Sequence, residues 1–341
     1  MIKVPPTADP TRKYIYESMA NSLKPFEREY VMYALLAAEY KKLCDENNED
    51  SAELTNYISE AFFLPGEVSL EKALQSPILL EDLGACGFKM WENEFDGLDL
   101  QHAIKVIETL GKHHGLGMVF VDRMKSFENE IYEDLLLPEY SAIFTDSVTE
   151  MLNSGLQIVI DWMDSANYDL DTTEKVKSLK AGLGPWSEFI YHNMKTMEPQ
   201  SFTHGDCRLN NFMFKYASDD INPAEVKIVD FQSWFKCQPT FELGYFLLSS
   251  LSKDLLLPNF DAIFQAYYTS MAGVLARLNY SNQRPSLQAL KEVFLSNIKY
   301  GFAMTSSMLN IVFMGNPDLD ENVKNRRIQD LVETAKYFGA I

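Results

Sequence analysis

The amino-acid sequence predicts an α+β fold, with a small α/β segment at residues 1–83 and a larger, mainly helical segment at 84–341. Three observations predict it. Short apolar runs bounded by prolines stand in the first segment and are typical of strands. Apolar residues recur at helical spacing through most of the second segment. A compact strand-like block at residues 201–232 interrupts that helical pattern.

The first segment begins with a strand that we expect at Ile2–Val4, ended by two prolines. A helix is expected from about Thr11 to Leu43, where apolar residues recur three and four positions apart. Two more strands are expected at Ala61–Leu64 and Ile78–Leu80, because both are short apolar runs next to a proline. This alternation of strand and helix predicts the small α/β unit.

The second segment opens with an amphipathic helix that begins after Asp99, a residue type that caps helix N-termini. We expect His113 and His114 to lie at the end of this helix and either to pack in the core or to interact by charge with the helix C-terminus. The remaining elements are expected as helices at 139–165 and 171–195, strands at Ser201–Thr203, Asn211–Tyr216 and Val226–Val229, and helices from about Phe241 to the end.

The composition excludes several classes of function. The chain carries 30 Lys plus Arg against 49 Asp plus Glu, so its formal net charge is −19. We therefore expect neither a nucleic-acid nor a membrane partner. The sequence has no run of about 18 apolar residues, no signal-peptide pattern, and no P-loop, GxGxxG, HExxH or GxSxG motif. The four cysteines are scattered and expected to be free thiols, which favours a cytoplasmic protein. The sequence leaves the oligomeric state open.

The strand-like block contains His204, Asp206 and Asn211 in the pattern H-x-D-x-x-x-x-N, and Asp230 follows 19 residues after Asn211. Phosphoryl transfer needs a carboxylate that accepts the proton of the attacking hydroxyl, here Asp206. It also needs oxygen ligands for Mg²⁺, here Asn211 and Asp230. His204 is expected to pack and hydrogen-bond as part of the scaffold. A structural interpretation stays open, in which these residues form a turn, a strand edge and a strand-end cap.

Four segments carry a resemblance to a known family: HGDCRLNNFMF at 204–214, VKIVDFQ at 226–232, LLEDLGACGF at 79–88 and LGKHHG at 110–115. They resemble the ecdysteroid kinase-like (CHK kinase-like) family, which is related to choline and aminoglycoside kinases and has the protein-kinase fold. The resemblance implies a two-lobe fold, with N-lobe and hinge at 1–83 and C-lobe at 84–341. It also implies an ATP- and Mg²⁺-dependent phosphotransferase acting on the hydroxyl of a small molecule, such as a steroid-like or xenobiotic alcohol.

Matched position by position, the resemblance assigns roles to individual residues. Asp206 would be the catalytic base, and Asn211 and Asp230 would be the Mg²⁺ ligands. The remaining matched positions would hold the nucleotide. Lys3 would contact the α/β phosphates, and Glu29 would be the helix glutamate that orients Lys3. The hinge residues would be Glu81, Asp82 and Leu83, whose backbone would meet the adenine.

Two departures from the family pattern are visible. Glu242 stands where the family usually carries an aspartate that supports the catalytic loop. If Lys3 is the third-strand lysine, the first two strands and the phosphate-covering loop would precede residue 1, so we expect an incomplete N-lobe. The alternative function is then a catalytically weak or inactive kinase-like protein that binds ligands or serves as a scaffold.

Overall fold

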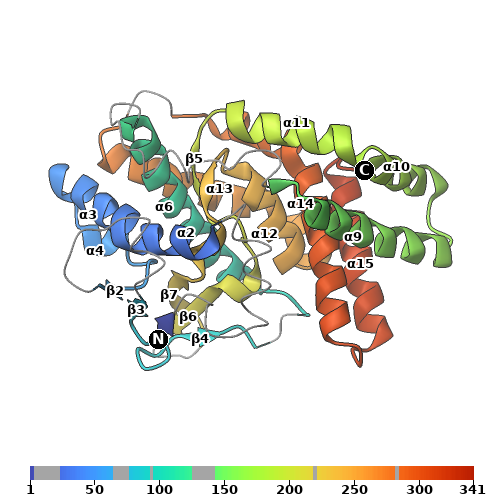
Figure 1. Ribbon diagram of the computed structural model, residues 1–341, viewed down its shortest axis with the longest axis horizontal. Coiled ribbons are helices and arrows are strands. Elements are labelled where there is room, and N and C mark those ends of the chain that lie inside the picture. Colours follow the sequence, from blue (N-terminus) through green and yellow to red (C-terminus); the bar gives the residue numbers. More distant parts are fainter. Residues whose placement is uncertain (4–23, 64–76, 93–94, 125–142, 218–220, 281–283) are drawn as a thin grey trace.

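The computed structural model of the chain describes residues 1–3, 24–63, 77–92, 95–124, 143–217, 221–280 and 284–341 (Figure 1). Its element order confirms the α+β class: short strands and small helices come first, and long helices dominate after them. Within the described residues, no helix is both long and apolar enough to cross a membrane.

The first sheet has three antiparallel strands in the order β1-β3-β2, which are β1 (Ile2–Lys3), β2 (Ala61–Phe62) and β3 (Ile78–Leu80). Lys3 lies opposite Ile78, and Ala61 lies opposite Leu80. The three expected strands are therefore confirmed, except that β2 already ends at Phe62, so the expected strand residue Phe63 lies beyond it. Val4 and Leu64 lie outside the described residues.

A bent helical segment packs beside this sheet. It consists of α2 (Pro25–Val31), the π-helical turn η1 (Met32–Leu36) and α3 (Ala37–Glu46), followed by the short α4 (Ser51–Leu54). Pro25 suits the first turn because that position has no helical partner for an N–H group. The expected helix from Thr11 to Leu43 is thus confirmed from residue 25, and its earlier part lies outside the described residues.

Two further sheets carry the polar block. One has the order β4-β6-β7, built from β4 (Lys89–Met90), β6 (Phe212–Tyr216) and β7 (Pro223–Ile228), and the other pairs β5 (Ser201–Thr203) with β8 (Phe235–Cys237). The 3₁₀ turns η2 (Leu209–Asn211) and η3 (Phe231–Ser233) connect them. The sequence did not reveal β4 and β8, because neither contains a β-branched residue or a run of apolar residues of the kind that indicated the other short strands.

Long helices form the remainder of the molecule (Figure 1), with α9, α10 and α15 at the end opposite to α3 and α4. α6 packs against α13, and α14 packs against both α12 and α9. A Cβ on Gly301 of α14 would lie 2.5 Å from the Gly244 carbonyl carbon of α12, so this crossing requires glycine. The bounds of these long helices are α6 (Leu100–Met124), α9 (Asp146–Ser165), α10 (Leu170–Ala181), α11 (Leu183–Thr196), α12 (Thr240–Ser250), α13 (Lys253–Arg277), α14 (Leu287–Gly315) and α15 (Glu321–Tyr337).

The end of α6 differs from the sequence-based expectation. The helix continues to Met124, so His113 and His114 lie within it, although both are fully buried as expected. Gly115 and Gly117 follow them and resemble a helix stop in the sequence. In the structure these glycines allow close packing instead: a Cβ would lie 2.9 Å from the Val274 side chain at Gly115 and 2.7 Å from the Phe202 amide nitrogen at Gly117.

Candidate active site

Lys3 forms ion pairs with carboxylates from two distant parts of the chain. Its Nζ donates to Glu29 Oε1 at 2.6 Å and Oε2 at 2.8 Å, and to Asp230 Oδ1 at 2.7 Å. The Glu29 side chain is buried, whereas the Asp230 side chain keeps 34% of its exposure. The contact expected between Lys3 and Glu29 is therefore present, and Asp230 joins the two as the most accessible member of one cluster.

Three contacts between distant segments hold this cluster together. β1 is placed by its pairing with β3, which sets the position of Lys3. The Arg28 guanidinium donates to the Trp234 carbonyl at 2.6 Å, and the Trp234 indole N–H donates back to the Arg28 carbonyl at 2.5 Å. Because Arg28 precedes Glu29 and Trp234 follows η3, these two bonds bring Glu29 close to Asp230.

The charges within the cluster compete with burial. Burial would lower the pKa of Lys3, but the carboxylates of Glu29 and Asp230 together raise it above its ordinary value. Burial raises the pKa of Glu29, and the ion pair with Lys3 only partly opposes this effect. Lys3 therefore stays a cation in the neutral pH range.

Asp206 lies in the loop between β5 and η2. The side-chain amide of Asn211 donates to the backbone carbonyl oxygen of Asp206 at 2.7 Å and to Asp206 Oδ2 at 3.1 Å. The Tyr245 hydroxyl donates to Asp206 Oδ1 at 3.3 Å, and Arg208 Nε lies 3.3 Å from the same carboxylate. Burial raises the pKa of Tyr245 well above its ordinary value, so Tyr245 remains a donor. Asp206 is consequently oriented from three directions.

His204 and Gly205 shape this loop. His204 Nε2 lies 2.9 Å from the Val229 carbonyl oxygen and donates to it, while Nδ1 accepts from the Asp206 N–H at 3.3 Å. The scaffold role expected for His204 is confirmed by these bonds. Gly205 has φ +81°, and a Cβ there would lie 1.9 Å from the Ser233 carbonyl oxygen. Only glycine fits this position, because the backbone is left-handed and the neighbouring chain is too close.

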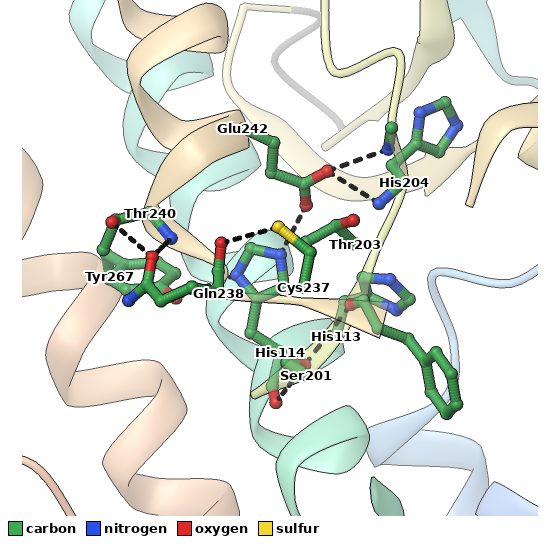
Figure 2. A network of polar contacts seen from close by, with 12 residues as sticks. His113, His114, Ser201, Thr203, His204, Cys237, Gln238, Thr240, Glu242 and Tyr267 are labelled. Carbon is green, nitrogen blue, oxygen red and sulfur yellow. Dashed lines mark hydrogen bonds and ion pairs between the residues drawn. The ribbon is translucent and has the colours of Figure 1, made fainter. Parts of the chain in front are cut away.

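Glu242 supports the same loop from the first turn of α12 (Figure 2). Its Oε2 accepts from the backbone N–H groups of His204 at 2.6 Å and Gly205 at 3.0 Å. Its Oε1 contacts His114 Nε2, and His114 Nδ1 lies 2.8 Å from the Tyr267 hydroxyl. The longer glutamate side chain therefore reaches the loop backbone, and the buried His114 of α6 holds it there.

The loop that carries Asp206 is linked to Asp230 through one residue, Val229. The Val229 N–H donates to the Asn211 carbonyl at 3.0 Å, and the Val229 carbonyl accepts from His204. Asp230 follows directly in a left-handed conformation, with φ 67° and ψ 54°, and its Oδ2 accepts from Gln232 Nε2 at 3.1 Å. Asp206, Asn211 and Asp230 thus belong to one hydrogen-bonded assembly.

The segment Glu81–Leu83 leads from β3 into the helical part. Glu81 Oε1 accepts from the Glu60 N–H and from Lys227 Nζ, both at 2.9 Å. The carbonyls of Asp82 and Leu83 accept from the backbone N–H groups of a following turn. Within the described residues, the Glu81 carbonyl and the Leu83 N–H have no hydrogen-bond partner. This segment therefore presents one backbone acceptor and one donor close together.

The family model of the ecdysteroid kinase-like family matches residues 1–280. This chain belongs to the ecdysteroid kinase-like family. Among solved structures it is similar to a Plasmodium vivax ethanolamine kinase, with a TM-score of 0.42 and 8% identity over 89% of this chain and 74% of that one. It is also similar to a choline/ethanolamine kinase family protein from Mesorhizobium loti, with a TM-score of 0.39 and 13% identity over 89% of this chain and 82% of that one. A search of curated proteins found no match.

The membership explains the arrangement of the elements. As a member of the ecdysteroid kinase-like family, the chain has the kinase-like α+β fold that its sequence predicted. The lysine strand, the carboxylate helix and the polar block meet at the same place although they are far apart in the sequence. The contact between Lys3 and Asp230 spans 227 positions.

The oxygen ligands present fit Mg²⁺. Among the described residues, no group of three or more His, Cys, Asp or Glu is suited to hold a metal. Mg²⁺ does not require such a group, because it keeps several waters and uses one or two carboxylates together with phosphate oxygens. Both bonds that Asn211 makes to Asp206 come from Nδ2, which leaves its Oδ1 as an acceptor without a partner among the described residues. Together with the accessible Asp230, this oxygen suits the ion.

Three contributors to the site were not found from the sequence. Arg208 and Tyr245 contact the Asp206 carboxylate, and Lys227 anchors Glu81. The position of Arg208, two residues after Asp206, was a usable signal. Tyr245 and Lys227 carried none, because only the folded chain brings them to the loop and to the hinge segment.

Replacing Gly205 by alanine is expected to destabilise the protein. A non-glycine residue in a strained left-handed conformation costs about 1–3 kcal/mol, and contact with the Ser233 carbonyl adds to that cost. Gly184→Ala is the matched control, because Gly184 lies in α11 and a Cβ there would meet nothing within 4 Å. Thermal unfolding checks both variants, and equal melting temperatures would contradict this interpretation of the loop.

Proposed function

We propose that this protein is an ATP- and Mg²⁺-dependent phosphotransferase that acts on the hydroxyl group of a small molecule. The observation that carries the proposal is the cluster in which Lys3 Nζ bonds both Glu29 and Asp230 within 2.8 Å. A lysine fixed by a buried helix glutamate and placed beside a metal-binding aspartate is the arrangement that phosphoryl transfer uses. The nucleotide would bind between residues 1–83 and 84–341.

Asp206 is the proposed catalytic base. Its carboxylate keeps 24% of its exposure and is oriented by Asn211, Tyr245 and Arg208. A positioned carboxylate can accept the proton of the acceptor hydroxyl as the new phosphate ester forms. Bound Mg²⁺–ATP would supply the phosphoryl group. Fixed orientation of this kind is the main contribution that a protein makes to phosphoryl transfer.

The metal and phosphate groups would be held by nearby side chains. Asn211 Oδ1 and the Asp230 carboxylate are the proposed Mg²⁺ ligands, and Lys3 is the proposed cation at the α/β phosphates. The chain as a whole carries a formal charge of −19, so local positive charge has to offset this repulsion. Lys3 provides it on one side, and Arg208 provides it beside Asp206.

The adenine would meet the backbone of Glu81, Asp82 and Leu83. The Glu81 carbonyl can accept from an exocyclic amino group, and the Leu83 N–H can donate to a ring nitrogen. The Glu81 side chain is held by Glu60 and Lys227, so it stabilises the segment and leaves recognition to the backbone. The family name suggests a steroid-like alcohol as acceptor, and the four free cysteines suit a cytoplasmic enzyme.

Nucleotide binding is the direct test. Calorimetric titration of the full chain with ATP is expected to show binding in Mg²⁺ and much weaker binding in EDTA, because the metal joins the phosphates to Asp230 and Asn211. Release of ADP with an alcohol acceptor then tests transfer. A catalytically inactive kinase-like binding protein would bind without turnover, and affinity that is the same with and without Mg²⁺ would contradict the proposed metal site.

A further inference from the structure

A pocket lies next to the loop that carries Asp206. It is lined by Arg208, Leu209 and Asn210 of the loop, by Leu309 and Val312 of α14, and by Arg327 of α15, and it measures about 50 Å³. This volume holds a group somewhat larger than one water molecule, whose share of liquid volume is ~30 Å³. The pocket therefore suits one end group of a ligand, next to apolar walls that would contact the rest.

Arg327 is a buried cation, and the carboxylates of Asp330 and Asp96 act on its charge without contacting it. Its side chain is 5% exposed, and within the described residues it forms no ion pair. Its single hydrogen bond goes from Nη2 to the Ser249 carbonyl at 2.5 Å. A guanidinium has five N–H donors, and buried charges in proteins are normally paired. Arg327 therefore has unused donors at a pocket that it lines.

Thr305 adds an unused hydroxyl on the same pocket. It is 1% exposed, and its Oγ1 has no hydrogen-bond partner among the described residues. The next two residues of α14 behave differently, because Ser306 donates to the Phe302 carbonyl at 2.8 Å and Ser307 to the Ala303 carbonyl at 2.9 Å. Buried hydroxyls are usually satisfied in this way. The hydroxyl of Thr305 is therefore available to bond a polar group that enters the pocket.

The charges around the pocket select the kind of ligand. Two arginines line it, and no aspartate or glutamate does. An ammonium group would be repelled here, whereas an oxyanion would meet Arg327 and the hydroxyl of Thr305. Arg208 lines the pocket and also contacts Asp206, so a ligand bound here lies next to the proposed catalytic base.

We propose that this pocket holds the carboxylate of the acceptor alcohol, bonded by Arg327 and Thr305, while the hydroxyl of the same molecule lies at Asp206. This inference rests on the proposed phosphotransferase function and narrows its substrate to hydroxy acids with an apolar body. Leu309 and Val312 contact that body. Arg327 and Thr305 are then specificity-determining residues.

Three alcohols of equal length test the charge preference: 6-hydroxyhexanoate, 1,6-hexanediol and 6-aminohexan-1-ol. With the full chain and Mg²⁺–ATP, kcat/KM from ADP release is expected to be at least roughly 10-fold higher for the hydroxy acid than for the diol, because charged hydrogen bonds contribute that much. The amino alcohol is expected to be the poorest substrate. Equal values for the three, or preference for the amino alcohol, would overturn the proposal.

Two variants assign the preference to its residues. Arg327→Met and Thr305→Val are expected to raise KM for the hydroxy acid and to leave KM for the diol unchanged. Arg326→Met is the matched control, because the neighbouring Arg326 is exposed and pairs with Asp96. Thermal unfolding establishes that each variant is folded, and Thr305→Val keeps the test decisive if the loss of Arg327 prevents folding. If a folded Arg327→Met or Thr305→Val variant still prefers the hydroxy acid to the diol as strongly as the wild type does, the replaced residue does not bind the carboxylate. That result would overturn the proposal.

Binding without nucleotide separates this inference from the proposed function. Calorimetric titration with 6-hydroxyhexanoate alone is expected to show binding that Arg327→Met weakens by at least roughly 10-fold. If this binding is present while Mg²⁺–ATP does not bind, the carboxylate site stands and the phosphotransferase function fails. If Mg²⁺–ATP binds and the hydroxy acid binds equally well to wild type and variant, the carboxylate site fails and the proposed function stands.

Discussion

Asp206→Asn is expected to lower kcat by roughly 10²–10⁴-fold, which is the usual contribution of a general base. The asparagine amide cannot accept the proton of the acceptor hydroxyl at neutral pH. Its carbonyl oxygen can still accept from Asn211 in place of Oδ2, and its amide group, in place of Oδ1, can donate to the Tyr245 hydroxyl. The bond from Asn211 to the backbone carbonyl of residue 206 is not affected, so the loop is expected to keep its shape. Affinity for Mg²⁺–ATP, measured by calorimetry, is therefore expected to stay close to that of the wild type.

A matched control comes from a distant aspartate. Asp261 of α13 is 89% exposed at its side chain and pairs with Lys291, so Asp261→Asn is expected to leave both kcat and nucleotide affinity unchanged. Wild-type turnover in Asp206→Asn would contradict the assignment of the base. Loss of nucleotide affinity in that variant would show instead that Asp206 holds the metal.

Asp230→Asn is expected to produce the opposite pattern, with a roughly 10–100-fold rise in the Kd for Mg²⁺–ATP. The substitution removes the negative charge that would face both the metal and Lys3. Asparagine tolerates the left-handed backbone that Asp230 adopts, so the effect can be assigned to charge without added strain. An alanine at this position would not allow that assignment.

The Mg²⁺ dependence of binding distinguishes the two aspartates. In Asp230→Asn, ATP affinity is expected to become nearly equal with Mg²⁺ and with EDTA, whereas Asp206→Asn keeps the difference. The control Asp261→Asn also keeps it. If Mg²⁺ strengthens ATP binding to Asp230→Asn as much as to wild type, the metal ligands lie elsewhere and the proposed site is wrong.

The candidate site was largely predictable from local patterns. The spacing of Asp206 and Asn211, followed by a β-branched strand before Asp230, indicates phosphoryl transfer because each residue type has the chemistry that the reaction needs. Most strands and helices were also predictable, because apolar runs and helical periodicity are properties of neighbouring positions. β4 and β8 were not found, because neither contains a β-branched residue or an apolar run, and α6 continues beyond the end that was expected at His113 and His114.

Contacts between distant residues were beyond the sequence alone. Lys3 pairs with Asp230 across 227 positions, and the two bonds between Arg28 and Trp234 span 206. Glu242 was expected to support the catalytic loop only through the family resemblance, and its contact with His114 appears only when α6 and α12 are packed.

The sequence by itself determined the α+β class, the residues suited to phosphoryl transfer and the family to which they belong. Only the tertiary structure decided that Asp230 joins Lys3 and Glu29 in one cluster, and that Arg327 and Thr305 line a pocket beside the loop that carries Asp206. The physical reason is that spacing and periodicity depend on a few neighbouring positions. Whether a charge is buried without a partner depends on every segment that packs around it, and that is known only for the folded chain.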